Sequence, residues 1–157
     1  AYTDRQIHDY IEAEDIGVAV VKFANGAYAT IEGTVNVYPR NLEESLTLLG
    51  ETGTVQAGGK SLNVIQTWNF ADRDDSAEMC QRFGENPPPV PGLGHTRIYE
   101  DMIDAIATGR MPTVSAEDGR RAMELILAIY QSAATGLPVD LPLKEGATID
   151  YAGRFDQ

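Results

Sequence analysis

The feature that most constrains the fold is the stretch 16–35, in which two apolar runs rich in β-branched residues flank Asn25-Gly26. Asn-Gly between such runs is the strongest short-range signal for a two-residue type I′ hairpin, because both central residues must adopt a positive φ. We therefore predict a β-hairpin in which Ala24 lies opposite Ala27.

That register divides the side chains of the hairpin between two faces. The first face is nearly all apolar and is expected to lie against helices: Ile16, Val18, Val20, Lys22, Ala24, Ala27, Ala29, Ile31, Gly33 and Val35. The second face mixes small residues, hydroxyls and two aromatic rings: Gly17, Ala19, Val21, Phe23, Tyr28, Thr30, Glu32 and Thr34. A face of this composition is unusual in water, so it is either a docking surface or a solvated face that carries a few aromatics.

Further strands and then helices follow along the chain. Strands are predicted over residues 1–3, 44–49, 54–57 and 61–70, with a short edge segment over 139–143. One helix is predicted over 96–108 with Gly109 as its left-handed cap, and a second runs from the N-cap Ser115 to Gly136. This order predicts an α+β fold: an open, mainly antiparallel sheet with helices on one face and the other face available for oligomerisation.

The domain is expected to span 1–143, and 144–157 is expected to be a loose polar tail. Inside the domain, the pattern disappears over 71–94, where a charged run at 72–75 precedes a proline-rich run at 87–91. A loop of that length is uncommon in a compact domain and is either functional or disordered.

Composition excludes several classes of protein. The net charge of −12 argues against a nucleic-acid groove or an anionic membrane surface, and no apolar run of membrane-spanning length is present. The single cysteine, Cys80, cannot form an internal disulfide, which fits the cytoplasm. Residues 1–15 are too polar for a signal peptide, and a start in a strand without Met is typical of a domain taken from a longer protein.

Familiar catalytic motifs are missing. The sequence has no G-x-G-x-x-G, G-x-S-x-G or H-E-x-x-H, and its only histidines are His8 and His95, so neither a catalytic residue nor a metal site is predicted. Residues 54–61 resemble a P-loop only at their end, and Gly58-Gly59 is interpreted as a turn. No acidic pair is placed in an apolar pocket, which argues against a carboxylate-based hydrolase.

A few polar residues are candidates for ligand contact. His95 lies directly before the first predicted helix, with Tyr99 close behind it, and Arg40 and Asn41 lie just past a strand end. For each of them, simple exposure to solvent is the alternative. Three acidic residues are predicted to form a solvated face, Glu12, Glu14 and Asp15, and two aromatics are assigned to the core rather than to a substrate platform, Trp68 and Phe70.

Several segments, taken together, resemble the C-terminal domain of the glucose–fructose oxidoreductase and inositol dehydrogenase family of NAD(P)-dependent oxidoreductases. The segments lie in this order: Glu14-Asp15, 23–27, 30–32, 48–53, 98–109 with Pro112, 115–119, and 127–133 with Gly136, Pro138 and Val139. The resemblance covers nearly all of the chain, from Tyr2 to Leu143.

The resemblance implies a parent enzyme that moves hydride between a nicotinamide and a secondary alcohol of a sugar, cyclitol or sugar nucleotide. An N-terminal Rossmann domain would bind NAD or NADP, and this domain would form the substrate site and a homodimer or tetramer through its open sheet. The family's Glu-Lys-Pro motif and its helical Asp and His are missing here. The fragment alone is therefore expected to be inactive and without cofactor.

Onto this sequence the resemblance carries the same four contacts, His95, Arg40, Asn41 and Tyr99. The alternative interpretation is a stand-alone dimeric ligand-binding module without catalysis. It would use the Phe23/Tyr28 face for self-association and the loop 71–94 for a ligand.

Overall fold

The computed structural model describes residues 1–85 and 93–156, and it divides into two compact units. The first unit comprises Ala1–Asn36 and Thr96–Gln157, and the second comprises Val37–His95. Every strand pairing within the described residues is antiparallel, in two three-stranded sheets rather than one continuous meander. Helices accompany both sheets, so the predicted α+β class is confirmed.

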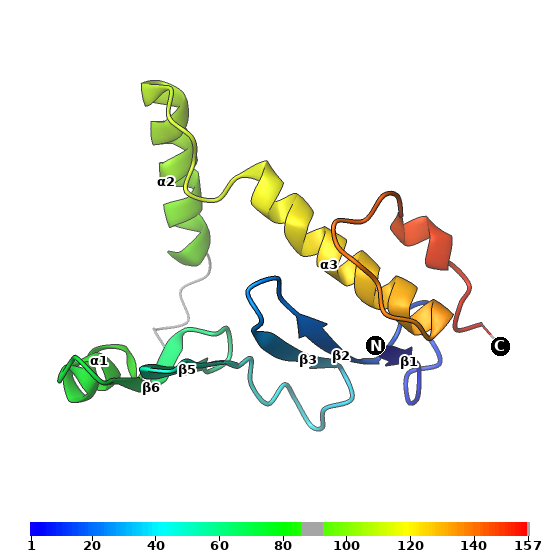
Figure 1. The fold of residues 1–157 in the computed structure, drawn as a ribbon, viewed down its shortest axis with the longest axis horizontal. Coiled ribbons are helices and arrows are strands. Elements are labelled where there is room, and N and C mark those ends of the chain that lie inside the picture. The colour runs from blue at the N-terminus through cyan, green and yellow to red at the C-terminus, as the bar shows by residue number, and fades with distance from the viewer. Residues whose placement is uncertain (86–92, 157) are drawn as a thin grey trace. The chain divides into compact units, whose positions relative to one another are not determined.

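The first unit contains the sheet β1(Tyr2–Asp4)–β2(Ile16–Lys22)–β3(Tyr28–Thr34), in that order (Figure 1). Lys22 lies opposite Tyr28, and the Phe23 amide donates to the Ala27 carbonyl at 2.8 Å. Gly26 alone in this loop has a positive φ, 92°. The connection is therefore a three-residue loop with glycine at its left-handed position, and the predicted two-residue turn with Ala24 opposite Ala27 is wrong.

This one-residue shift exchanges the two faces of β2. Ala19 is buried and Val21 is half-buried on the inner face, beside Ala29 and Ile31, which the prediction had placed correctly. The predicted apolar residues of β2 lie on the outer face instead, where Val20 is 71% exposed. The outer face also carries exposed aromatic and aliphatic side chains, namely Tyr2, Val18 and Tyr28.

Helix α3 (Ala116–Thr135) lies across this sheet (Figure 1). Ser115 and Asp118 form a reciprocal capping box at its start, and Gly136 ends it with φ 69°, as predicted. Ala128 is buried, and the amino group of Ala1 donates to the Ser132 hydroxyl at 2.8 Å, which ties the first strand to the helix.

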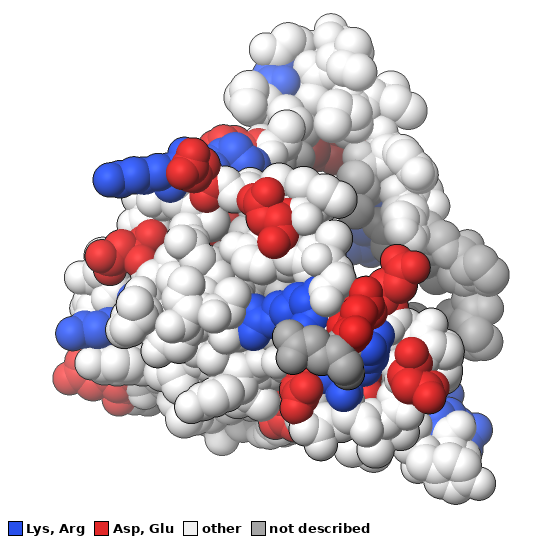
Figure 2. All heavy atoms as spheres, turned by 90° about the vertical axis from the view of Figure 1, so that its right-hand side faces the viewer, with Lys and Arg blue, Asp and Glu red and all other residues white. Residues whose placement is uncertain are grey.

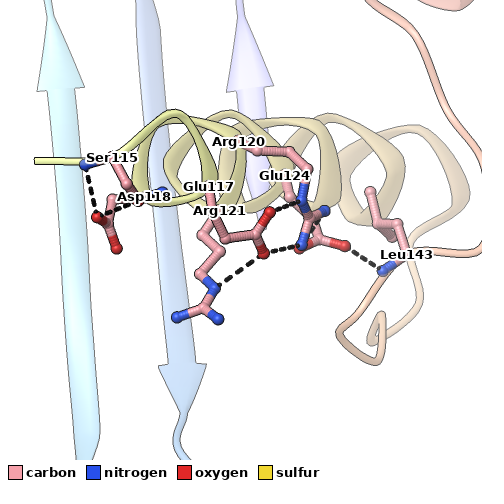
Figure 3. Close-up of polar contacts among 7 residues, drawn as sticks. All are labelled: Ser115, Glu117, Asp118, Arg120, Arg121, Glu124 and Leu143. Carbon is pink, nitrogen blue, oxygen red and sulfur yellow. Dashed lines mark hydrogen bonds and ion pairs between the residues drawn. The ribbon is translucent and has the colours of Figure 1, made fainter. Parts of the chain in front are cut away.

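One polar side of α3 carries a chain of charged contacts (Figure 3). Arg120 bonds to Glu117 and Glu124, and the carboxylate of Glu117 also accepts from Arg121. The guanidinium of Arg120, assisted by that of Arg121, lowers the pKa of Glu117 to about 2. Glu124 in turn accepts the Leu143 amide at 2.7 Å, which holds the chain after α3 against the helix.

That returning chain differs from the prediction in two ways. Residues 139–143 form no strand, so the expected edge segment is wrong: Pro138 and Pro142 remove backbone donors, and the Leu143 amide bonds to a side chain instead. The expected loose tail contains the 3₁₀ turn η1 (Thr148–Tyr151), whose Tyr151 ring stacks on that of Tyr130 with centroids 5.3 Å apart.

Helix α2 (Leu93–Thr108) ends at Gly109, φ 71°, as predicted. The connection to α3 is fixed by Asp101, whose carboxylate accepts the Thr113 amide at 2.7 Å and Arg110 at 2.8 Å. These donors lower the pKa of Asp101, the Thr113 amide having the largest effect. Ala105 is buried, but most large apolar side chains of α2 are exposed: Ile98, Tyr99, Met102, Ile103 and Ile106.

The second unit contains the sheet β4(Leu46–Leu49)–β5(Gly53–Gly58)–β6(Val64–Phe70), close to the predicted strands. The turn after β5 has Gly59 at φ 93°, whereas Gly58 is the last residue of the strand and lies opposite Val64, so the predicted turn begins one residue later, at Gly59. Helix α1 (Ser76–Phe83) packs on β6, so residues 76–83 are not the loop that was expected there. The proline-rich part of that expected loop lies outside the described residues.

The two aromatics of β6 that were predicted for the core are not among the buried residues of the described chain. Trp68 and Phe70 are half-buried and meet edge to face at 5.0 Å, with the guanidinium of Arg73 over both rings. The Trp68 indole donates to Asp75, which also pairs with Arg73. This cluster joins the end of the sheet to the start of α1.

Candidate functional site

The four predicted ligand contacts are exposed and lie on two segments. His95 and Tyr99 are four residues apart on α2, which places them one turn apart on one side of the helix. Arg40 and Asn41 lie in the irregular chain before β4, and Arg40 makes no hydrogen bond or ion pair to another described residue. The structure thus groups His95 with Tyr99 and Arg40 with Asn41, and all four stay predictions.

Asp15 is the polar residue that the sequence interpretation placed wrongly. Its side chain is fully buried, and its carboxylate accepts the amides of Ile7 at 2.7 Å, Gln6 at 2.9 Å and His8 at 3.0 Å. Burial alone would raise the pKa of Asp15, but these amide donors outweigh burial and hold it well below its usual range. Asp15 therefore fixes the loop between β1 and β2 rather than joining a solvated acidic face.

Glu14, beside it, also leaves that expected face. Its carboxylate accepts the Tyr130 hydroxyl from α3, and Arg154 donates to the Tyr130 carbonyl at 3.1 Å. Burial and the neighbouring Glu14 carboxylate raise the pKa of Tyr130, so its hydroxyl keeps its proton and acts as a donor. The sequence offers little signal for this pair, because the two residues are 116 positions apart.

A groove of about 320 Å³ lies beside this pair, between the inner face of the first sheet and α3. Its walls are mostly aliphatic, and Glu14 and Thr3 supply polar groups at its lining. The Thr3 hydroxyl is buried and has no hydrogen-bond partner within the described part of the chain. Among the described residues no group of three or more His, Cys, Asp or Glu side chains is placed to hold a metal ion.

A dinucleotide does not fit these residues. Such a cofactor needs a glycine-rich turn between a parallel strand and a helix N-terminus, so that amide groups face the pyrophosphate. Across residues 1–85 and 93–156 the strands pair only antiparallel, and of the adjacent glycines 58 and 59 the first ends β5 and the second lies in the hairpin turn to β6. The described residues therefore contain no cradle of this type.

On the face drawn in Figure 2, Lys and Arg side chains lie among Asp and Glu, in keeping with the net charge of −12. Of the helices that the structure describes, none combines the length and apolar character needed to cross a membrane.

The described residues thus belong to the α+β class of domains, with helices beside antiparallel sheets. Residues 1–141 match the family described as "Oxidoreductase family, C-terminal alpha/beta domain", and the chain belongs to this family. The resemblance drawn from the sequence is thereby confirmed.

Known relatives agree with this assignment. The WlbA dehydrogenase from Bordetella pertussis, solved in complex with NADH and UDP-GlcNAcA, is 37% identical with a TM-score of 0.78, over 91% of this chain and 41% of that one. The WlbA dehydrogenase from Chromobacterium violaceum, solved with the same two molecules, is 33% identical with a TM-score of 0.74, over 92% and 39%.

A levoglucosan dehydrogenase from Pseudarthrobacter phenanthrenivorans is 28% identical in an alignment of 145 residues that covers 84% of this chain and 37% of that protein. The chain therefore spans about two fifths of the length of the relatives it matches.

Proposed function

We propose that this chain is the substrate-binding and oligomerisation domain of an NAD(P)-dependent oxidoreductase. The parent enzyme would oxidise a secondary alcohol of a sugar, cyclitol or sugar nucleotide in the cytoplasm, with the cofactor held by a separate N-terminal domain. The observation that carries the proposal is the family match over 1–141 together with structural similarity to dehydrogenases that were solved with NADH. The described residues contain no dinucleotide cradle, which supports a cofactor site in a separate domain.

The test compares the natural full-length gene product with the 1–157 chain. The full-length protein is expected to bind NADH or NADPH and to oxidise at least one of UDP-GlcNAcA, levoglucosan and inositol, while the 1–157 chain does neither. Fluorescence titration measures binding, and absorbance of the reduced nicotinamide measures turnover. Tight NADH binding by the 1–157 chain, or no nicotinamide binding by the full-length protein, would overturn the proposal.

The substrate contacts are proposed to be His95, Tyr99, Arg40 and Asn41. All four are exposed polar side chains, and His95 and Tyr99 share one side of α2. His95→Ala and Arg40→Ala in the full-length enzyme are expected to lower kcat/KM by roughly tenfold each, which corresponds to one lost hydrogen bond. Arg121→Gln, on an exposed turn of α3, is the matched control and is expected to leave kcat/KM unchanged.

The outer face of the first sheet is proposed as the surface between subunits. It exposes Tyr2, Val18, Val20 and Tyr28 on adjacent strands, and contiguous apolar exposure of this kind marks interaction sites. The double variant Val20→Lys with Tyr28→Glu is expected to turn the oligomer into a monomer in analytical ultracentrifugation. An unchanged mass would show that the subunits meet elsewhere.

A further inference from the structure

We infer that the groove between the inner face of the first sheet and α3 receives an apolar stretch of the polypeptide that precedes Ala1. The inference rests on the proposed function, because it requires this chain to be the C-terminal part of a longer protein. It concerns the first unit alone, since the lining residues all belong to Ala1–Asn36 and Thr96–Gln157.

The apolar walls of the groove remain partly exposed to solvent. Its walls include Ile31, Val35, Ile126 and Ile129, yet Ile126 is 43% exposed and the others are only partly buried or exposed. In the described part of the first unit, the fully buried apolar residues are all alanines: Ala19, Ala105 and Ala128. Removal of apolar area from water is the main driving force of folding, so a further apolar segment on these walls would be strongly favoured.

The shape and polar groups of the groove suit a polypeptide. Gly17 and Gly33 line it, and a Cβ at Gly33 would meet nothing within 4 Å, so a second chain segment can approach the strands closely. The buried Thr3 hydroxyl needs a partner, and Glu14 lines the groove with a carboxylate. A backbone carbonyl would accept from the Thr3 hydroxyl, and a backbone amide would add a second donor to the Glu14 carboxylate, which already accepts the Tyr130 hydroxyl.

The position of Ala1 indicates that the segment in the groove is the one that precedes Ala1. Its amino group bonds to Ser132 on α3, and Thr3, two residues later, lines the groove. Residues before Ala1 would therefore start at the edge of the groove. The matched relatives are more than twice as long as this chain, and the family is a C-terminal domain, so most of their length precedes the matched part. A covalently attached segment has a high effective concentration, which favours it over an occupant from solution.

Thiol accessibility tests the inference. Ile126→Cys is made with Cys80→Ser, in both the natural full-length protein and the 1–157 chain, and its reaction with a maleimide is followed. The thiol is expected to react at least tenfold more slowly in the full-length protein. Met123→Cys is the matched control, because Met123 is 52% exposed on the same helix and does not line the groove, so its rate is expected to be the same in both.

Equal rates for Ile126→Cys in the two proteins would overturn the inference. Protection in the 1–157 chain that increases with its concentration would also overturn it, in favour of a second copy. Protection that appears only with added nicotinamide or sugar would overturn it in favour of a small ligand. If a variant is misfolded, the rate of amide hydrogen exchange in α3 is compared between the two proteins without substitutions. Exchange is expected to be slower in the full-length protein.

NADH titration of the same samples separates the two proposals. Bound NADH with an unprotected thiol rejects the groove inference alone, and a protected thiol without NADH binding rejects the proposed function alone.

Discussion

The two units of this chain differ in the contacts that stabilise each of them internally. In the first unit, several side-chain contacts join residues more than 100 positions apart: Ala1 with Ser132, Glu14 with Tyr130, and Arg5 with the Phe155 carbonyl. In the second unit, neighbouring strands pair through short turns and α1 packs on the strand just before it. The second unit should therefore form from local structure, while the first requires both parts of the chain.

The largest effect is expected from Asp15→Ala in the first unit. The change leaves three amide groups of the loop without their acceptor, so the melting temperature should fall by roughly 10 °C. Asp9→Ala is the control, because Asp9 is exposed in the same loop and should have no measurable effect. Thermal unfolding by far-UV circular dichroism makes the measurement, and equal melting temperatures for the two variants would show that the Asp15 turn is not decisive.

The same carboxylate predicts sensitivity to acid. Burial would raise the pKa of Asp15, but the amides of Ile7, Gln6 and His8 hold it well below its usual range. Stabilisation by a group with a lowered folded-state pKa is full above the unfolded value of about 4 and is lost as the pH falls toward the folded value. The stability difference between the natural sequence and Asp15→Asn should therefore shrink below about pH 4. A difference that is independent of pH would contradict this assignment.

Helix ends and strands that depend on local sequence patterns could be predicted from the sequence. Gly109, Ser115 and Gly136 mark helix ends through backbone conformation or capping, and all three act as predicted. Strands of the second unit follow their apolar patterns between turns. Helix α1 was missed although Met79 and Phe83 lie four residues apart in it, because its charged start resembles a loop.

Features that depend on strand pairing or on the conformation of an irregular loop could not be predicted from local sequence patterns. Apolar residues occur on both faces of β2, and Asn25-Gly26 is compatible with a two- or a three-residue loop, so the register was ambiguous. Asp15 follows other acidic residues and has the appearance of a surface position, because its donors lie seven to nine residues earlier in an irregular loop. For the candidate site, the sequence placed His95 and Tyr99 on a helix, but it gave no signal for the groove.

A smaller effect, confined to the second unit, is expected from Gly53→Ala. A Cβ at this position would lie 2.5 Å from the Phe70 ring and 3.2 Å from the Asn69 carbonyl, so the ring must move at a cost of about 1–3 kcal/mol. The matched control is Gly33→Ala on β3, where a Cβ meets nothing within 4 Å and stability should not fall. Trp68 is the only tryptophan and lies on β6, so its fluorescence reports this unit during urea unfolding.

Loss of stability in Gly33→Ala equal to that in Gly53→Ala would contradict the steric explanation. A shift of the fluorescence transition without a shift of the helical signal would show that the second unit unfolds by itself.

The smallest effect is expected from Tyr130→Phe, which tests the long-range contacts of the first unit. The variant loses the hydroxyl that donates to Glu14 but keeps the ring stacked on Tyr151, so the free energy of unfolding should fall by only about 1 kcal/mol. Tyr10→Phe is the control, because Tyr10 is 78% exposed in the same unit and its change should be neutral. Urea unfolding is followed by circular dichroism and by Trp68 fluorescence, which reports the second unit. An equal shift of both signals in Tyr130→Phe would show that the two units unfold together. In that case the difference between long-range and local contacts would not produce a difference in stability.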